Sequence, residues 1–211
     1  MGYGYKLGVD LPGESRGYIP NAKVYDKYYS EGHWSANTII SVAIGQGEIL
    51  ATPLQIANLG ATIANRGYFI TPHVVKGIQD TVMDEKLLEK RYPTVEPHYY
   101  NAVADGMRTA VTGGTCRRAA IPGIEVCGKT GTAQNPHGKD HSAFMGFAPY
   151  KDPKIAVAVY VEGGGWGATF GVPIGSLVME KYLTGTIAPE RRYMEEQMLN
   201  MTLYYAAPKK K

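Results

Sequence analysis

The sequence has few of the features that mark specialised classes of protein. Two cysteines among 211 residues are too few for a disulfide scaffold or a four-cysteine zinc site. With 22 Lys and Arg against 19 Asp and Glu, the net charge is +3, which does not indicate a nucleic-acid partner. No apolar run approaches the ~20 residues that span a bilayer. The opening MGYGYKLGVD also lacks the apolar stretch of a signal peptide.

The chain does contain enough apolar material for one folded domain. A composition of 44% hydrophobic and 19% charged residues excludes a wholly disordered chain. A compact protein of this length buries roughly 70% of its unfolded surface. The first 50 residues are rich in Gly, Tyr and Pro, so we expect irregular structure there, with short extended pieces.

Two helices are predicted in the middle of the chain. Thr52 and Gln55 can form a capping box at the start of a helix that ends near Gly67. A second apolar stripe, spaced for a helix, covers about residues 97–111. Between the two helices, residues 70–78 are predicted to be extended.

Three strands and a helix are predicted in the last third. Apolar residues alternate most clearly in the third strand, and the connection 149–153 is short enough for a hairpin. We therefore expect one antiparallel sheet in chain order, with a helix over 173–183 on one face, in an α+β fold. The strands are expected at 124–133, 141–148 and 154–162.

A literal motif match suggests one alternative function. Residues 123–130, GIEVCGKT, fit the phosphate-binding loop of nucleotide-binding proteins letter for letter. That loop needs a helix opening at its Lys-Thr, so that helix N–H groups point at phosphate. Here Gly131, Pro136 and Gly138 follow and disfavour a helix. A P-loop protein stays an alternative, which a helix directly after Lys129 would support.

The same residues fit the K-T-G element of penicillin-binding serine acyl-transferases better. The Lys129 ammonium would supply positive potential near a nucleophile, and the Thr130 hydroxyl could bind a substrate carboxylate. Gly131 would let a substrate approach the strand backbone without a clash. A backbone N–H just beyond it could stabilise an oxyanion.

With its neighbouring motifs, this element resembles a known family. Over about residues 4–184, the sequence is similar to the C-terminal part of class B penicillin-binding protein transpeptidases, most closely the elongation type. The motifs that carry the resemblance are Gly8-Val9-Asp10-Leu11-Pro12-Gly13-Glu14, Ile44-Gly45-Gln46-Gly47, Ala51-Thr52-Pro53-Leu54-Gln55-Ile56-Ala57, Gly131-Thr132-Ala133-Gln134 and Gly146-Phe147-Ala148-Pro149.

The resemblance implies the transpeptidase fold that penicillin-binding proteins share with serine β-lactamases. In that fold, Lys129 shapes the electrostatics of the cleft, and the backbone N–H of Thr132 belongs to the oxyanion hole. Thr130, Gly131 and Thr132 would bind substrate. No metal or organic cofactor is implied.

The sequence departs from the family at the nucleophile. None of its six serines has a lysine three residues later, so the S-x-x-K nucleophile is absent from this chain. Ser35-Ala36-Asn37 matches the second element, S-x-N, by chance, because it lies too far along the chain. We expect residues 1–184 to be a partial transpeptidase domain and 185–211 a tail, partly helical and then disordered.

The implied function of the intact protein is peptidoglycan cross-linking by a serine-type D,D-transpeptidase. Its partners would be stem peptides, β-lactams and the upstream half of the same protein, with no nucleic acid. The family implies the periplasmic face of the inner membrane, with an anchor outside this chain. Alone, the chain is expected to be inactive and to self-associate through sheet edges. A non-catalytic scaffold is the other alternative.

Four further side chains have open roles at this point. His141 either lines the cleft or is a solvated loop histidine, and Trp166 either lies near the substrate groove or packs its own loop. Cys116 and Cys127 flank the turn before the K-T-G strand. With two cysteines in the chain, free thiols are favoured over a disulfide.

Overall fold

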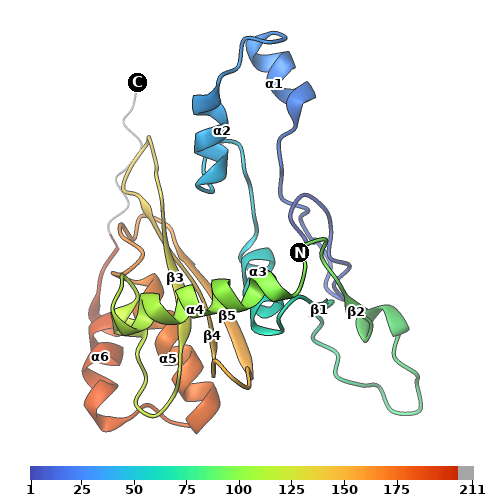
Figure 1. Ribbon diagram of the computed structural model, residues 1–211. Helices are drawn as coiled ribbons and strands as arrows, with labels where there is room; N and C mark the ends of the chain where they lie inside the picture. The colour runs from blue at the N-terminus through green and yellow to red at the C-terminus, as the bar shows by residue number, and fades with distance from the viewer. Residues whose placement is uncertain (204–211) are drawn as a thin grey trace.

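The computed structural model describes residues 1–203, in which one sheet lies between two layers of helices (Figure 1). The sheet consists of β3 (Cys127–Ala133), β4 (His141–Ala148) and β5 (Ile155–Val161). On one face lies α5 (Gly171–Thr184), with α6 (Arg192–Asn200) against it. The other face is covered by α3 (Pro53–Ala64) and α4 (His98–Thr112).

Most of the remaining elements lie outside this body. An arm of residues 20–50, the α1–α2 arm, projects from the top of the molecule, and a small hairpin extends from the far side of α3 (Figure 1). These outer elements are α1 (Ala22–Tyr29), α2 (Ala36–Ala43), β1 (Phe69–Ile70), β2 (Lys90–Arg91) and the 3-10 turn η1 (Glu85–Leu87). The 3-10 turns η2 (Arg117–Ala119) and η3 (Pro189–Arg191) belong to the body, where η2 packs against α4 and α5 and η3 against α6.

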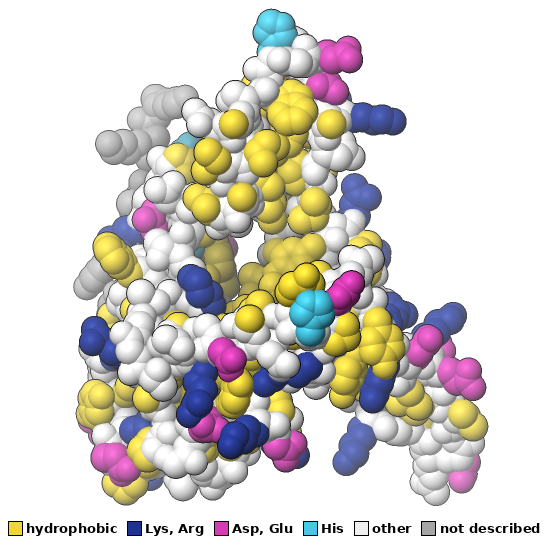
Figure 2. Space-filling view, in the orientation of Figure 1, with side chains coloured by type: hydrophobic (Ala, Val, Ile, Leu, Met, Phe, Trp, Pro, Cys, Tyr) yellow, Lys and Arg dark blue, Asp and Glu magenta, His cyan; other side chains and the backbone are white. Residues whose placement is uncertain are grey.

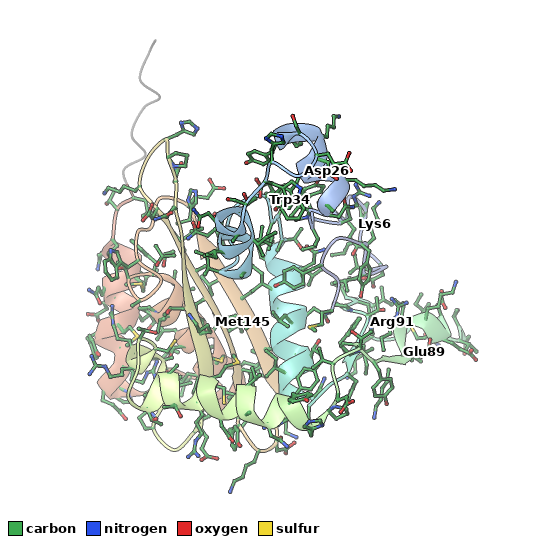
Figure 3. The ribbon with its side chains drawn as sticks, turned by 45° about the horizontal axis from the view of Figure 1, so that its top comes forward. Lys6, Asp26, Trp34, Glu89, Arg91 and Met145 are labelled. Carbon is green, nitrogen blue, oxygen red and sulfur yellow. The ribbon has the colours of Figure 1, made fainter. Side chains whose placement is uncertain are left out.

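The sheet confirms the predicted order and direction. β3 pairs antiparallel with β4, and β4 pairs antiparallel with β5, so β4 is central. In this register Thr130 lies opposite Phe144 and Thr132 lies opposite Ser142. Successive strand side chains point to opposite faces, so Phe144 faces α5 while Met145 points toward α3 (Figure 3).

A single aromatic ring organises the core between the sheet and α5. Phe144 is 1% exposed, and three glycines surround its ring. A Cβ on Gly128 or Gly146 would lie 2.6 Å from the ring, and one on Gly175 would lie 2.5 Å from it. Because interiors are close-packed, the ring fits only where these positions have no side chain.

The capping box predicted for α3 is confirmed, and it also fixes the N-terminal segment. The Thr52 hydroxyl accepts the Gln55 N–H at 3.2 Å, and Gln55 Oε1 accepts the Thr52 N–H at 2.9 Å. The buried Gln55 Nε2 then donates to the carbonyls of Gly2 and Arg16, at 2.5 and 2.9 Å. The helix predicted over 97–111 is confirmed as α4.

The predictions for residues 1–50 and 70–78 were wrong in part, because helices interrupt the irregular structure within the arm. The arm contains two helices, whereas residues 70–78 include only the end of a two-residue strand and an isolated bridge at Ile78. Asn21 caps α1 through its side chain, and Tyr25 is the buried residue of that helix. Each of these helices spans only eight residues, which is shorter than the window of about 11–18 residues in which helical periodicity can be recognised.

The tail after α5 packs more closely than a surface helix. Arg191 is 5% exposed and donates to the Ala120 carbonyl and the Ser176 hydroxyl. Its Nε lies 3.1 Å from Glu180 Oε2 on α5, in an ion pair that lacks hydrogen-bond alignment. Met194 of α6 is also buried. The predicted disordered end falls on residues 204–211, outside the described residues.

Replacing Gly175 with alanine is expected to lower the free energy of unfolding by about 1–3 kcal/mol, because the new methyl overpacks the Phe144 ring. The matched control is Gly106→Ala in α4, where a Cβ meets nothing within 4 Å. That change should raise stability by roughly 0.5–1 kcal/mol through helix propensity. Urea unfolding of both variants measures the contrast, and two equal effects would contradict it.

Replacing Arg191 with methionine should cost about 3–5 kcal/mol, because it leaves the Glu180 carboxylate, 2% exposed, without a cationic partner. The double variant Glu180→Leu, Arg191→Met removes both charges and should lose clearly less. Denaturant unfolding of the two variants decides the matter. A single variant as stable as the parent chain would mean that the tail does not anchor the core.

Candidate functional site

The predicted site residues lie on β3, an edge strand of the described sheet. Alternation places Lys129 and Gly131 on the face that looks toward α3, and Thr130 and Thr132 on the face that looks toward α5. Lys129 is exposed, while the next four residues are half-buried. The structure thus brings all four K-T-G-T residues to one sheet edge but divides their side chains between two faces.

A cavity of about 590 Å³ lies beside this edge, on the Gly131 face. Its walls come from the sheet, from the end of α2 and from the segment that leads into α3. In Figure 2, hydrophobic side chains gather around the opening between the arm and the body. Residues from five parts of the chain contribute to the lining, among them Tyr3, Gln46, Gly131, Ala143 and Tyr160.

Alternate residues of β3 direct their backbone N–H and C=O groups toward the free edge of the strand. The carbonyls of Thr130 and Thr132 accept hydrogen bonds from side chains, Lys129 Nζ at 2.6 Å and Gln46 Nε2 at 3.4 Å. A Cβ placed on Gly167 would meet Gly131 O, Gly131 N and Ala143 O together, which puts the Gly131 polar groups between the strands. In an antiparallel strand the N–H and C=O of one residue point the same way. The amides of Thr130 and Thr132 therefore face outward.

The segment that follows α4 contacts this edge. The Thr115 hydroxyl lies 3.0 Å from the Thr130 hydroxyl. Cys116 follows and is fully buried, and burial raises the pKa of its thiol. Cys127 is also a buried free thiol, and burial raises its pKa to about 12. The prediction of free cysteines is confirmed, and thiols with such pKa values are poor nucleophiles near neutral pH.

The connection from β5 to α5, residues 162–170, closes the other side of Thr132. The Gly167 N–H donates to the Thr132 hydroxyl at 3.2 Å. The His141 side chain accepts the Gly163 N–H on Nδ1 at 3.0 Å, so the neutral ring carries its proton on Nε2. His141 is therefore an anchored strand residue rather than a solvated loop histidine. Trp166 is 77% exposed and does not pack its own loop.

The P-loop alternative is wrong. Lys129 and Thr130 lie inside β3, and the strand continues to Ala133 where a phosphate-binding loop would begin a helix. No helix N-terminus therefore points at this loop. Within residues 1–203, no three His, Cys, Asp or Glu side chains gather in a way that could hold a metal ion.

Sequence reasoning missed three residues that contact the site. Gln46 lies in the Gly45–Gly47 motif, which signalled the family but not the hydrogen bond to Thr132. Thr115 is 15 residues before Thr130, and nothing in the spacing indicates their contact. Ser142 is buried opposite Thr132, and its alternation in β4 could have placed it on that face.

Comparisons with known proteins show which family the chain resembles. Residues 1–180 match the family described as penicillin binding protein transpeptidase domain. The peptidoglycan D,D-transpeptidase MrdA of Haemophilus influenzae is 33% identical over 214 residues, which cover 92% of this chain and 33% of the relative. MrdA of Acinetobacter baumannii is 35% identical, over 80% of this chain and 28% of the relative.

Solved structures agree in fold. Pseudomonas aeruginosa PBP2, in complex with WCK 5153, superposes with a TM-score of 0.73 at 35% identity, over 90% of this chain and 44% of that one. Helicobacter pylori PBP2, in complex with MreC, gives 0.71 at 30% identity, over 87% of this chain and 34% of that one.

The chain spans about a third of the length of the curated relatives it matches. None of the helices in the described part of the chain is long and apolar enough to cross a membrane. The shared motifs, the sheet order and the position of the K-T-G strand agree with the family match over most of the chain. The chain therefore belongs to the penicillin binding protein transpeptidase domain family, in its PBP2-type branch.

Proposed function

We propose that this chain is the K-T-G wall of a serine-type peptidoglycan D,D-transpeptidase. The observation that carries the proposal is the free edge of β3, where Gly131 and Thr132 line a cavity, Lys129 is exposed just before them, and the Thr132 amide is directed outward. A substrate peptide could pair with such an edge as an added strand. The relatives' names, D,D-transpeptidase, agree with acyl transfer at this edge.

The reaction needs a nucleophile from outside this chain. A serine oxygen attacks the carbonyl carbon between two D-alanines, the C–N bond breaks, and the terminal D-alanine leaves as a protonated amine. The amine of a neighbouring stem peptide then attacks the acyl-enzyme ester and returns the proton to the serine oxygen. β-Lactams would acylate the same serine and remain attached.

Each K-T-G residue has a specific task in this proposal. The Lys129 ammonium lowers the energy of the negative charge that develops in the cleft. The Thr132 N–H, directed away from β4, donates to the oxyanion of the tetrahedral intermediate. Thr130 binds the terminal carboxylate, and Gly131 leaves room for the substrate backbone.

The arm exposes an apolar surface, and this supports the proposal that another part of the intact protein packs against it and completes the site. Ile40 and Ile44 of the α2 region are 58% and 68% exposed, and the cavity beside them is lined mainly by apolar atoms. Exposed apolar surface of this kind marks an interaction site. We propose the upstream half as its occupant, with self-association through the sheet edges as the alternative outcome for the isolated chain.

The cellular setting is part of the same proposal. The intact protein would act at the periplasmic face of the inner membrane, held there by a segment outside this chain. Helicobacter pylori PBP2 was solved with MreC, and we propose that the intact protein also works in such an assembly.

Lys129→Ala in the intact protein should slow acylation by labelled penicillin about 10²-fold, because it removes the cleft's positive charge. Lys154→Ala is the matched control, since that lysine is exposed and lies just before β5. Its acylation rate should be unchanged. Equal rates for Lys129→Ala and the parent enzyme would remove Lys129 from the mechanism.

The isolated chain should acquire no covalent penicillin adduct, because none of its serines has the activating lysine of the family motif. Intact-mass measurement after prolonged incubation tests this. A stoichiometric mass increase on any serine would show that this chain carries its own nucleophile, and would contradict the division of the site that we propose.

A further inference from the structure

We propose that Ser142 is a positioning residue of the transpeptidase site, and that its hydroxyl holds the β5–α5 connection against β3 and thereby orients Thr132. The inference rests on the proposed function, because it assigns Ser142 a role in aligning the oxyanion donor. Ser142 lies on β4 directly opposite Thr132 and is completely buried.

The Ser142 hydroxyl is fully used within this connection. It donates to the Trp166 carbonyl at 2.9 Å, with the Gly167 carbonyl at 3.2 Å as a second acceptor. It also accepts the Gly171 N–H, in the first turn of α5, at 3.0 Å. One buried hydroxyl thus joins the middle of the connection and the first turn of α5 to the central strand.

The connection lies so close to β3 that a small displacement would reach the K-T-G backbone. A Cβ on Gly167 would lie 2.4 Å from the Gly131 carbonyl and 2.7 Å from the Ala143 carbonyl. A Cβ on Gly164 would lie 3.0 Å from the Ser142 Cβ. Backbone therefore rests on backbone here, and no flexible side chain absorbs a shift between them.

The contact reaches Thr132 through one hydrogen bond. The Gly167 N–H, next to the two carbonyls that Ser142 holds, donates to the Thr132 hydroxyl at 3.2 Å. Two other bonds fix the outer end of the connection, from Gly163 to His141 and from Gly165 to the Asp140 carbonyl. Ser142, which is itself completely buried, holds the inner end, nearest to Thr132.

Alanine at position 142 would keep the volume almost unchanged but leave the Gly171 N–H and the Trp166 carbonyl without their partner. A buried donor such as the Gly171 N–H is costly to leave without a partner, so a shift of the connection that supplies a new partner is favoured. We therefore expect a change in the geometry of the connection, transmitted to the Thr132 amide, rather than a collapse of the core. Misplacement of a catalytic group by about 1 Å can cost up to 10²-fold in rate.

The test compares variants of the intact protein by their acylation rate constant with fluorescent penicillin. Ser142→Ala should lower this constant at least about tenfold, with little change in the dissociation constant of the preceding non-covalent complex. Ser176→Ala is the matched control, because Ser176 is equally buried but bonds to Ala119 and Arg191, away from the connection. Its acylation constant should stay within twofold of the parent value.

A double-mutant cycle separates positioning from general stability. Thr132→Val keeps the backbone N–H but removes the hydroxyl that Gly167 contacts, so it should reproduce the loss by itself. In its presence Ser142→Ala should add little. The inference would be overturned if the two losses in acylation rate were additive, or if Ser142→Ala left the rate unchanged. If Ser142→Ala does not fold, an unchanged acylation rate in Thr132→Val would overturn it instead. Unchanged acylation in Lys129→Ala would count against the proposed function instead.

Discussion

The pairing of β3 with β4 on one side alone is the constraint on which the rest of the structure depends. An antiparallel strand with one neighbour leaves every second amide and carbonyl without a partner in the sheet. Here those positions include Thr130 and Thr132. An unpaired edge is usually a liability, but beside a cavity and a lysine it becomes a surface on which a peptide can be aligned.

The surrounding packing keeps this edge rigid. Phe144, opposite Thr130, packs tightly among three glycines and thereby fixes β4 against α5. The β5–α5 connection covers the Thr132 side, and the segment after α4 covers the Thr130 side through Thr115. Arg191 then connects the tail, α5 and the Ala120 backbone that leads into β3. The strand is therefore held from both ends while its outer edge stays open.

The sequence predicted the sheet, α3, α4 and α5 because their periodicity and caps are local. The Thr52–Gln55 box and the alternation in β5 are determined by neighbouring residues. The helices of the arm were not predicted because each spans only eight residues, shorter than the window of about 11–18 residues in which helical periodicity can be recognised. The helix expected in the tail is present as α6, but the anchor before it was not predicted, because Arg191 is a charged residue whose burial depends on a distant Glu180.

The site residues divide in the same way, into those that local sequence patterns predict and those that depend on contacts between distant segments. The K-T-G residues and their shared strand followed from motif and pattern, whereas Gln46, Thr115 and Ser142 reach the strand through contacts across the fold. Residue-resolved amide hydrogen exchange in this chain tests the central claim most directly. We expect protected amides at Lys129 and Gly131 and fast exchange at Thr132. Protection of Thr132 equal to that of Gly131 would contradict an outward-facing oxyanion donor.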